Sequence, residues 1–521
     1  MKPPGVGGGD LTVTGRVYLV GAGPGDPGLL TRRGERCLAA ADVVVHDYLV
    51  GSRLLELVRP GAEVVALGSS HADRARLDQD AIDALVADRA RAGKVVVRLK
   101  NGDPFLLGRG AEEAEALARA GIPFEVVPGV SSAFAVPAYA GIPLTHRDHA
   151  SLVTIATGHQ ARTDGEPTPP ALPWDALVRQ RGTLVFLMGM RQLPAILAAL
   201  TAHGLPPGTP AAAVQWGTTS RQATVVADVE TLAGRVAAAG LAAPGVLVIG
   251  DVVALRARVR WLEARPLFGR RIVVTRPRPQ ANALADLLEE HGADVVSFPT
   301  IEIVPPLDPA PLERAVAVAA GYDWIVFTSA NGVQTFFERF AAQGHDVRDL
   351  AGTRLAAIGP ETAAQLERRL LRPAVVPDDY RAEGLLAALA HEDLRGRRVL
   401  LPRAAGARPI LPDELVRRGA RVDEVIAYRA VPPANADVAG LRDALRAGTI
   451  DAVTFTSSST VRHFVELVGA DVVRNGRPLI ACIGPVTADT ARELGLPVDV
   501  TPATYTVAAL ADALADRLRP T

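Results

Sequence analysis

The chain contains 521 residues, of which 48% are hydrophobic and 22% are charged, and its formal net charge is −1. This length predicts two to four domains with full hydrophobic cores, and the near-zero charge excludes a protein-wide field that would attract nucleic acid or an anionic membrane. No apolar run approaches the ~18 residues of a membrane span, and the Gly/Pro-rich start lacks the apolar core of a signal peptide. We therefore expect a cytoplasmic protein whose residues 1–10 are disordered.

The first predicted element is a strand that runs into a glycine-rich loop. Val17–Val20 is a short apolar run with β-branched and aromatic residues, typical of a buried strand, and Gly21–Gly28 follows it. Because that density of glycine and proline continues neither a strand nor a helix, we predict a loop, and then a helix over residues 29–41. Strand, glycine loop and helix form the nucleotide-type site of α/β sheets. The spacing is not a dinucleotide fingerprint, and a tight βα turn is the structural alternative.

Two more loops of this kind follow predicted strands. Strands are expected at Asp42–Asp47, Glu63–Leu67, Lys94–Leu99 and Phe124–Val127, and helices at Gln79–Ala92 and Ala111–Ala120. The third of these strands leads into Lys100–Phe105, and the fourth leads into Pro128–Ser132. Alternating strands and helices imply a largely parallel sheet, with the loops after the strands at one edge. Three loops rich in Gly, Pro, Ser and Asp at that edge predict one ligand site.

A series of longer motifs in this half resembles a known family. The motifs are GAGPGDPGLLT, ADVVVHDYLV, RLKNGDPFLLGRGAEE, VVPGVSSAFAVPAYAGIPLTHR, TLVFLMG and VQWGTT. In this order they resemble uroporphyrinogen-III C-methyltransferase, from about Gly15 to Trp261. The resemblance implies a tetrapyrrole methylase fold of two α/β subdomains, with S-adenosylmethionine bound between them, and a homodimer formed through this half.

The resemblance also implies site residues. The positions that match the family's S-adenosylmethionine contacts are Pro24, Asn101, Gly102, Asp103, Leu106, Ser131, Ser132, Met188 and Gly217. Met188 would supply a polarizable wall for the adenine, although a methionine considered alone is more often core filler. Asp47 matches the family's catalytic base, which takes a proton when a pyrrole carbon is methylated; a helix cap or turn residue is the structural alternative. Arg147, Arg109 and Arg98 are candidates to bind the carboxylates of the tetrapyrrole substrate.

The chain departs from the family pattern at two positions. The loop that usually reads Gly-Gly-Asp is Asn101-Gly102-Asp103 here. We expect the loop to keep its conformation, because asparagine tolerates left-handed backbone. The family commonly places a lysine, with a proposed role as proton donor, where this chain has Ser69. His71 or Arg74 would substitute for it, unless the lysine is dispensable.

A Pro/Gly break at Pro266–Gly269 predicts a domain boundary near Arg265, after a charged closing helix over residues 254–264. The second half contains an internal repeat: Trp324–Asn331 matches Ala452–Ser459, and Ala357–Ala363 matches Cys482–Ala488. Each pair places a strand before a helix start whose backbone amides can bind anions, so we predict two similar α/β lobes. Repeated helix caps without a ligand are the structural alternative.

The second half resembles uroporphyrinogen-III synthase. The motifs are RIVVTRPRPQANALADLLEEHGADVVSFPTIEI, YDWIVFTSANGV, RVLLPRA, VDEVIAYRAV and IDAVTFTSSSTV. The resemblance implies a methyltransferase domain at 15–264 and a synthase domain at 268–518, with lobe one at about 268–302 and 429–518 and lobe two at about 303–428. It also implies a β-ribbon between the lobes. Tyr428 matches a tyrosine that helps to expel water, and the donors for substrate carboxylates are Thr328, Ser329, Thr456, Ser457 and Thr487.

The sequence therefore predicts a bifunctional α/β enzyme that acts on small-molecule tetrapyrroles. Its second half would cyclise hydroxymethylbilane to uroporphyrinogen III, and its first half would methylate this product twice to precorrin-2, for sirohaem or cobalamin. One alternative is a methylase of another ring position; another is a synthase-like half that only senses tetrapyrroles. Cys37 and Cys482 are predicted to be buried free thiols, and no metal site is expected.

Overall fold

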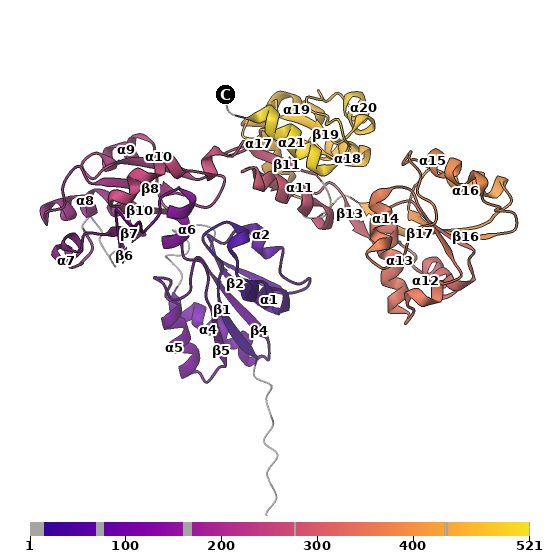
Figure 1. Cartoon of the computed structure of the whole chain (residues 1–521). Coiled ribbons are helices and arrows are strands. Elements are labelled where there is room, and N and C mark those ends of the chain that lie inside the picture. Colours follow the sequence, from indigo (N-terminus) through magenta and orange to yellow (C-terminus); the bar gives the residue numbers. More distant parts are fainter. Residues whose placement is uncertain are drawn as a thin grey trace, which may run out of the picture. The chain divides into compact units, whose positions relative to one another are not determined.

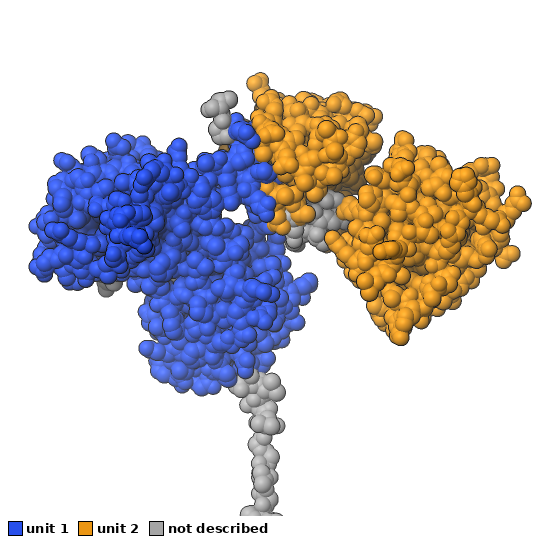
Figure 2. All heavy atoms as spheres, viewed as in Figure 1, with its two compact units in different colours: residues 1–270, 288–294, 518–521 blue, residues 271–287, 295–517 orange. Residues whose placement is uncertain are grey.

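The computed structural model describes residues 15–68, 78–159, 169–275, 278–431, 433 and 436–519, with side chains omitted at 278–282. Contacts divide the chain into two compact units (Figure 2). Unit 1 comprises residues 1–270, 288–294 and 518–521, and unit 2 comprises residues 271–287 and 295–517. Each unit contains two sheets (Figure 1).

The first sheet of unit 1 is parallel and has the strand order β3-β2-β4-β1-β5. Its strands are β1 (Arg16–Gly21), β2 (Val43–Asp47), β3 (Glu63–Leu67), β4 (Val95–Lys100) and β5 (Phe124–Val127). Its helices are α1 (Arg32–Ala40), α2 (Ser52–Leu55), α4 (Gln79–Arg91) and α5 (Gly110–Arg119), and the turn η1 (Pro27–Leu29) precedes α1.

Alternating side chains give this sheet two buried faces. Val43 and Val45 pack with residues of α4 and α5, whereas Val44 packs on the other face with residues of α1 and α2. Because successive side chains of a strand point to opposite faces, the nearly continuous apolar runs of these strands build a three-layer α/β/α arrangement. The prediction of a parallel sheet is confirmed here.

The second sheet of unit 1 is mixed, with the order β6-β7-β10-β8-β9. Its strands are β6 (Val153–Thr157), β7 (Thr183–Leu187), β8 (Pro210–Gln215), β9 (Ala223–Asp228) and β10 (Gly245–Ile249). Its helices are α6 (Ser132–Tyr139), α7 (Trp174–Arg179), α8 (Leu193–Ala202) and α9 (Leu232–Ala238). Only β6 and β7 pair in parallel, and the other neighbouring strands pair antiparallel. Helix α6 follows β5 of the first sheet yet contacts β7 and β10 of the second, and thereby joins the two subdomains.

The prediction of one continuous closing helix over residues 254–264 is wrong. The chain instead forms three short pieces, η3 (Asp251–Leu255), α10 (Arg256–Val259) and η4 (Leu262–Ala264). One further short turn of unit 1, η2 (Met190–Gln192), lies between β7 and α8. Tertiary contacts override the helical pattern: buried Arg256 bonds to Glu263 and to the backbone oxygen of Ala140, and Trp261 Nε1 donates to the backbone oxygen of Ala138.

Unit 2 contains a four-stranded sheet of order β12-β11-β18-β19. Its strands are β11 (Arg271–Val274), β12 (Asp294–Ser297), β18 (Ala452–Phe455) and β19 (Leu479–Cys482). Its helices are α11 (Arg278–Glu290), α17 (Val438–Arg446), α18 (Ser458–Val468), α19 (Ala470–Gly476), α20 (Pro485–Glu493) and α21 (Val507–Leu518). Strand β11 pairs in parallel with β18, about 180 residues later in the chain, and Figure 1 shows β11 among the yellow C-terminal elements.

The other sheet of unit 2 has the order β13-β17-β16-β14-β15. Its strands are β13 (Glu302–Val304), β14 (Trp324–Phe327), β15 (Arg354–Ala357), β16 (Arg398–Ala404) and β17 (Arg421–Val431). Its helices are α12 (Ala310–Ala317), α13 (Ala330–Ala342), α14 (Pro360–Glu367), α15 (Ala382–Ala388) and α16 (Ile410–Arg417), with turns η5 (Ala319–Gly321), η6 (Val347–Leu350) and η7 (Leu389–His391). The end of β17 pairs antiparallel with β13, which forms a ribbon where the chain enters and leaves this sheet.

The two sheets of unit 2 repeat one construction. Ala356 bridges Val375 in one sheet, and Ala481 bridges Val500 in the other. Gly359 packs against the ring of Tyr380, and Gly484 packs against Tyr505 in the same manner. The predicted repeat is therefore confirmed in detail. Both cysteines are buried and free, as predicted, and burial raises the pKa of the Cys482 thiol to about 12.

Candidate active site

Three strand ends meet at one edge of the first sheet. Strand β1 lies between β4 and β5, so the loops that follow these three strands are neighbours. The first two are joined directly: the Gly23 N–H donates to the Gly102 oxygen over 3.2 Å, and the Gly102 N–H donates to the Gly23 oxygen over 2.8 Å. Gly102 has φ +66°, a conformation that favours glycine.

At the same edge of the sheet, the backbones of the three loops lie so close together that Gly21 and Gly129 leave no space for a side chain. A Cβ atom on Gly21 would lie 2.5 Å from Gly129 Cα and 2.6 Å from the Gly102 oxygen. A Cβ on Gly129 would lie 2.2 Å from the Gly102 oxygen. The three loops therefore touch through bare backbone. The site prediction missed Gly21 and Gly129, although both were in the loops it singled out.

Asp103 holds the second and third loops together. One carboxylate oxygen accepts from the backbone N–H groups of Phe105 and Leu106 at 2.9 and 3.1 Å, and the other accepts from the N–H of Gly129 at 3.1 Å. The expected role was a direct ligand of the cofactor. The structure adds a positioning role, because these bonds fix the shape of both loops.

The third loop leads into α6. Ser131 is buried at the N-cap of this helix, where its Oγ accepts from the N–H of Ala133 at 3.2 Å, and Ser132 is half-buried. Gly102 faces them, since a Cβ on it would lie 3.7 Å from the Ser132 nitrogen. The structure thus brings Gly102, Asp103, Ser131 and Ser132 together. Pro24, Asn101 and Leu106 lie in the same loops and are half-buried.

The second subdomain contacts this edge through the loop after β8. A Cβ on Gly217 would lie 2.4 Å from Val136 of α6, and the Thr218 hydroxyl oxygen accepts from the N–H of Asp26 at 3.1 Å. Asp26 in turn accepts from the Tyr139 hydroxyl at 2.7 Å. Sequence reasoning missed this link, because Asp26 and Thr218 are 192 residues apart.

Backbone strain is concentrated around these loops. Among the described residues, five of the eight non-glycine residues with positive φ belong to the loops after β4, β7 and β8: Leu107, Arg109, Met188, Trp216 and Thr218. Such conformations cost free energy and cluster at functional sites. Met188 has φ +57° and is 50% exposed, which argues against the core-filler interpretation and fits an exposed apolar wall.

Asp47 is the last residue of β2, at the same edge of the sheet. Arg98 Nη2 of β4 donates to its Oδ1 at 2.7 Å, and the Asp47 side chain is 19% exposed. Arg98 itself is fully buried, so the suggestion that it binds substrate carboxylates is wrong. Residues of α4 and α5 cover this face of the sheet, which one sequence cannot show.

The other predicted cations of this half lie on the surface. Arg147 is exposed in the turn between His146 and Ala150, and Arg109 is exposed beside Glu112. Ser69, His71 and Arg74 lie outside the described residues. The prediction that His71 or Arg74 substitutes for the family's lysine at position 69 therefore stays a prediction.

In unit 2, Tyr428 and Ser329 come together. Tyr428 lies on β17 and Ser329 caps α13; the Tyr428 hydroxyl donates to Ser329 Oγ at 3.0 Å. Burial raises the pKa of the Tyr428 phenol, whereas hydrogen bonds to Ser329 and Asn331 lower it. Burial dominates, so the phenol stays protonated at neutral pH and can donate a proton. Asn331 was quoted in the repeat but missed as a site residue.

The remaining predicted donors lie at the matching helix starts. Thr328 precedes the α13 cap, and Thr456 precedes Ser457, which caps α18. Thr487 is buried in the first turn of α20. Ser458 Oγ donates to the Val486 oxygen at 3.2 Å, which places the starts of α18 and α20 side by side.

Comparisons with known proteins match each half separately. The profile of Tetrapyrrole (Corrin/Porphyrin) Methylases matches residues 16–233, and the profile of Uroporphyrinogen-III synthase HemD matches residues 282–512. "Porphyrin biosynthesis protein HemD" of Ruminiclostridium josui is 36% identical over 482 residues, which are 92% of this chain and 94% of that protein. "Uroporphyrinogen-III C-methyltransferase" of Bacillus subtilis is 38% identical over 366 residues, 70% of this chain and 74% of that protein.

Among solved structures, uroporphyrin-III C-methyltransferase from Thermus thermophilus complexed with S-adenosylhomocysteine is 38% identical. It covers 46% of this chain and 100% of that chain, with a TM-score of 0.39.

Fold, site and comparisons together define an α/β protein of tetrapyrrole biosynthesis with a methylase half and a synthase half. The chain belongs to the family in which a uroporphyrinogen-III C-methyltransferase domain is fused to a uroporphyrinogen-III synthase domain. The predicted family and fold class are confirmed. Tetrapyrrole methylases use S-adenosylmethionine, in agreement with the expected cofactor.

No helix in the described part of the chain is long and apolar enough to cross a membrane. No group of three or more His, Cys, Asp or Glu side chains there is arranged to hold a metal ion.

Proposed function

We propose that the chain is a bifunctional enzyme that makes uroporphyrinogen III from hydroxymethylbilane and methylates it twice to precorrin-2. The observation that carries the methylase proposal is the single sheet edge at which three glycine loops meet beside Asp47. In a parallel α/β sheet this edge is where ligands bind.

The loops suit S-adenosylmethionine because their bare backbone allows close approach and their polar groups point to one edge. The cofactor would be held by residues of the three loops: Pro24, Asn101, Gly102, Asp103, Leu106, Ser131 and Ser132. Met188 and Gly217 would cover the bound cofactor from the second subdomain. When bound, S-adenosylmethionine supplies an electrophilic methyl carbon. Asp47 accepts, at its carboxylate, the proton that the tetrapyrrole loses as its new C–C bond forms.

The synthase half needs no cofactor in this proposal. The carboxylates of the linear substrate bind at the starts of α13, α18 and α20, where hydroxyls and backbone N–H groups gather. Holding both ends of a flexible chain near each other supplies much of the acceleration. The protonated Tyr428 phenol helps the substrate hydroxyl to leave as water, which exposes a methylene carbon on the first ring. The α-carbon of ring D that already carries a bridge bonds to this methylene carbon, and its old bond to the bridging carbon then breaks. The released bridging carbon bonds to the other α-carbon of ring D, which loses a proton, so ring D is inverted in the product.

The direct test is incubation of the full chain with hydroxymethylbilane, with and without S-adenosylmethionine. We expect uroporphyrinogen III without the cofactor and precorrin-2 with it. Binding of hydroxymethylbilane without turnover would instead favour a tetrapyrrole-sensing second half. Methylation only of a later corrinoid, and not of supplied uroporphyrinogen III, would favour a methylase of another ring position.

The domain limits 15–264 and 268–518 are part of the proposal, as is a homodimer formed through the methylase half. We expect a fragment ending near Arg265 to fold and methylate uroporphyrinogen III, and a fragment starting near Pro266 to fold and cyclise hydroxymethylbilane. Circular dichroism, sedimentation and the two assays check this. If each fragment needs the other in order to fold, the boundary is misplaced.

Asp103→Ala is expected to weaken S-adenosylmethionine binding by at least about tenfold, because loss of charge-assisted hydrogen bonds typically costs more than 1 kcal/mol. The substitution removes the acceptor that ties Gly129 to the second loop. Isothermal titration calorimetry measures the affinity, with Asp88→Ala on the exposed face of α4 as control. An unchanged affinity would contradict the assigned cofactor site.

Tyr428→Phe is expected to slow cyclisation about tenfold or more, because phenylalanine fills the same space but cannot donate a proton. Tyr322→Phe is the matched control: Tyr322 is equally buried in unit 2 and donates to Asp423 at 2.7 Å, away from the proposed site. Hydroxymethylbilane consumption is the readout. Equal rates in both variants would exclude a chemical role for Tyr428.

A further inference from the structure

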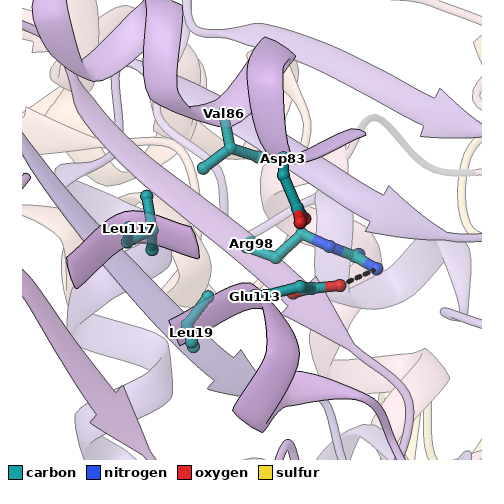
Figure 3. Close-up of a pocket in the computed structure, with 6 residues that line it drawn as sticks. All are labelled: Leu19, Asp83, Val86, Arg98, Glu113 and Leu117. Atoms are coloured by element: carbon teal, nitrogen blue, oxygen red, sulfur yellow. Dashed lines mark hydrogen bonds and ion pairs between the residues drawn. The ribbon is translucent and has the colours of Figure 1, made fainter. Parts of the chain in front are cut away.

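Behind Asp47 lies a buried cluster of charged side chains that the proposed chemistry does not use. Arg98 Nη2 contacts Asp47 Oδ1 at 2.7 Å and Glu113 Oε1 at 3.3 Å, and Lys100 Nζ contacts the same Glu113 oxygen at 2.6 Å. The side chains of Arg98, Lys100 and Glu113 are at most 4% exposed. Figure 3 shows Arg98 and Glu113 with their dashed contact beneath α4.

Strand geometry explains how these groups meet. Arg98 pairs with Val45 across β4 and β2, and Asp47 lies two residues beyond Val45, on the same face of the sheet. Lys100 lies two residues beyond Arg98 and shares this face. Helix α5 covers the face and supplies Glu113. The cluster thus contains two cations and two carboxylates, and Asp83 of α4 adds a third carboxylate at its edge.

A small cavity adjoins the cluster, and two polar atoms without a protein partner face it. Arg98 Nε and Glu113 Oε2 are buried and make no hydrogen bond among the described residues. Both residues line a cavity of about 10 Å³ together with Asp83 of α4 and the apolar side chains of Leu19, Val86 and Leu117 (Figure 3). This volume is the smallest that holds one water molecule, and Arg98 Nε and Glu113 Oε2 are the polar atoms without a protein partner that line it.

We propose that Arg98 is a positioning residue for Asp47, which it orients at the end of β2 for proton transfer. This inference rests on the proposed methylase function, in which Asp47 is the base. Glu113 anchors the guanidinium from α5, so the Asp47 carboxylate is fixed by a chain of contacts that reaches into the core. Arginine suits this role because its planar fork can contact two carboxylates at once, which a lysine ammonium does only as a point charge.

A purely structural role is the competing explanation, and stability alone cannot exclude it. Buried ion pairs are often no more stabilising than well-packed apolar side chains of similar volume, although breaking one is costly. The test must therefore separate turnover from folding. Arg256 provides a matched control: it is a buried arginine of the same unit, bonded to Glu263 and to the Ala140 oxygen, and it does not contact Asp47.

The experiment compares the full-length variants Arg98→Lys, Arg98→Met and Arg256→Met. For Arg98→Met we expect kcat for uroporphyrinogen III methylation to fall about tenfold or more. The dissociation constant for S-adenosylmethionine and the KM for uroporphyrinogen III should stay within about twofold. Arg98→Lys should recover part of the loss, whereas Arg256→Met should lower the melting temperature and leave kcat unchanged. Equal kcat values in Arg98→Met and Arg256→Met would overturn the inference.

Arg98→Lys keeps the test decisive if Arg98→Met does not fold. We expect it to lower kcat about threefold or more in the wild-type background and to have no effect in an Asp47→Asn background, because the two residues act as one unit. An equal effect in both backgrounds, or none in either, would overturn the positioning role. Failure of the proposed function looks different: the wild-type chain would not methylate uroporphyrinogen III, or Asp47→Asn would retain full turnover.

Discussion

Asp47→Asn is expected to lower kcat for methyl transfer by about 10²-fold or more, the range typical of a lost general base. Asparagine keeps the shape of the side chain and an oxygen that can still accept from Arg98 Nη2. It cannot accept a proton from the tetrapyrrole. The affinity for S-adenosylmethionine should stay unchanged, because the three loops that form the proposed cofactor site do not depend on this carboxylate for their mutual contacts.

The substitution also leaves a buried positive charge without one of its two carboxylate partners. We therefore expect a lower melting temperature as well, since removing one partner of a buried ion pair typically costs about 3–5 kcal/mol and Asp47 is only partly buried. Turnover has to be measured well below that temperature and normalised to folded protein. A variant that binds the cofactor, is folded and turns over at the wild-type rate would mean that solvent takes the proton.

Ser69→Lys completes this test by restoring the lysine of the family pattern. If the lysine and Asp47 cooperate, the substitution should raise turnover only when Asp47 is present. Equal increases in both backgrounds would show that the two groups act independently, and the assignment of Asp47 as base would lose its support.

Local chemistry made the three loops predictable, because glycine and proline at the ends of apolar runs exclude regular structure. Their mutual contacts were not predictable. The pairing of Gly23 with Gly102 depends on the strand order, which places β1 between β4 and β5. The same order brings Gly129 against Gly21. A single sequence shows which residues are available for such contacts, but it does not show which of them become neighbours in the fold.

Arg98 illustrates the limit most clearly. Within the run Lys94–Leu99 an arginine is expected at a surface, where it would be available to an anionic substrate. Its burial depends on Glu113, 15 residues further along the chain, and on the residues of α4 and α5 that cover this face of the sheet. Likewise, the charged pattern of residues 254–264 indicated a helix, but the contacts of Arg256 and Trp261 with the end of α6 broke it into short turns. In both cases tertiary contacts outweighed a local pattern.

Gly129→Ala is expected to abolish measurable S-adenosylmethionine binding and to destabilise unit 1. The added Cβ would lie 2.2 Å from the Gly102 oxygen and 2.7 Å from Gly21 Cα, both of them backbone atoms that no side-chain rotation can move aside. Gly129 does not have a positive φ, so alanine is compatible with its backbone conformation and the effect is purely steric. Overpacking of this kind typically costs about 1–3 kcal/mol, and the loops must separate to relieve it.

Gly208→Ala is the control for this substitution, because a Cβ at Gly208 would meet no atom within 4 Å and its backbone is not in the left-handed region. We expect that variant to bind the cofactor and to melt as the wild type does. Calorimetric titration of both variants, with thermal unfolding measured in parallel, separates the loss of the site from general instability. If Gly129→Ala binds S-adenosylmethionine with wild-type affinity, the cofactor cannot depend on the close contact of the three loops, and the site must be sought elsewhere in unit 1.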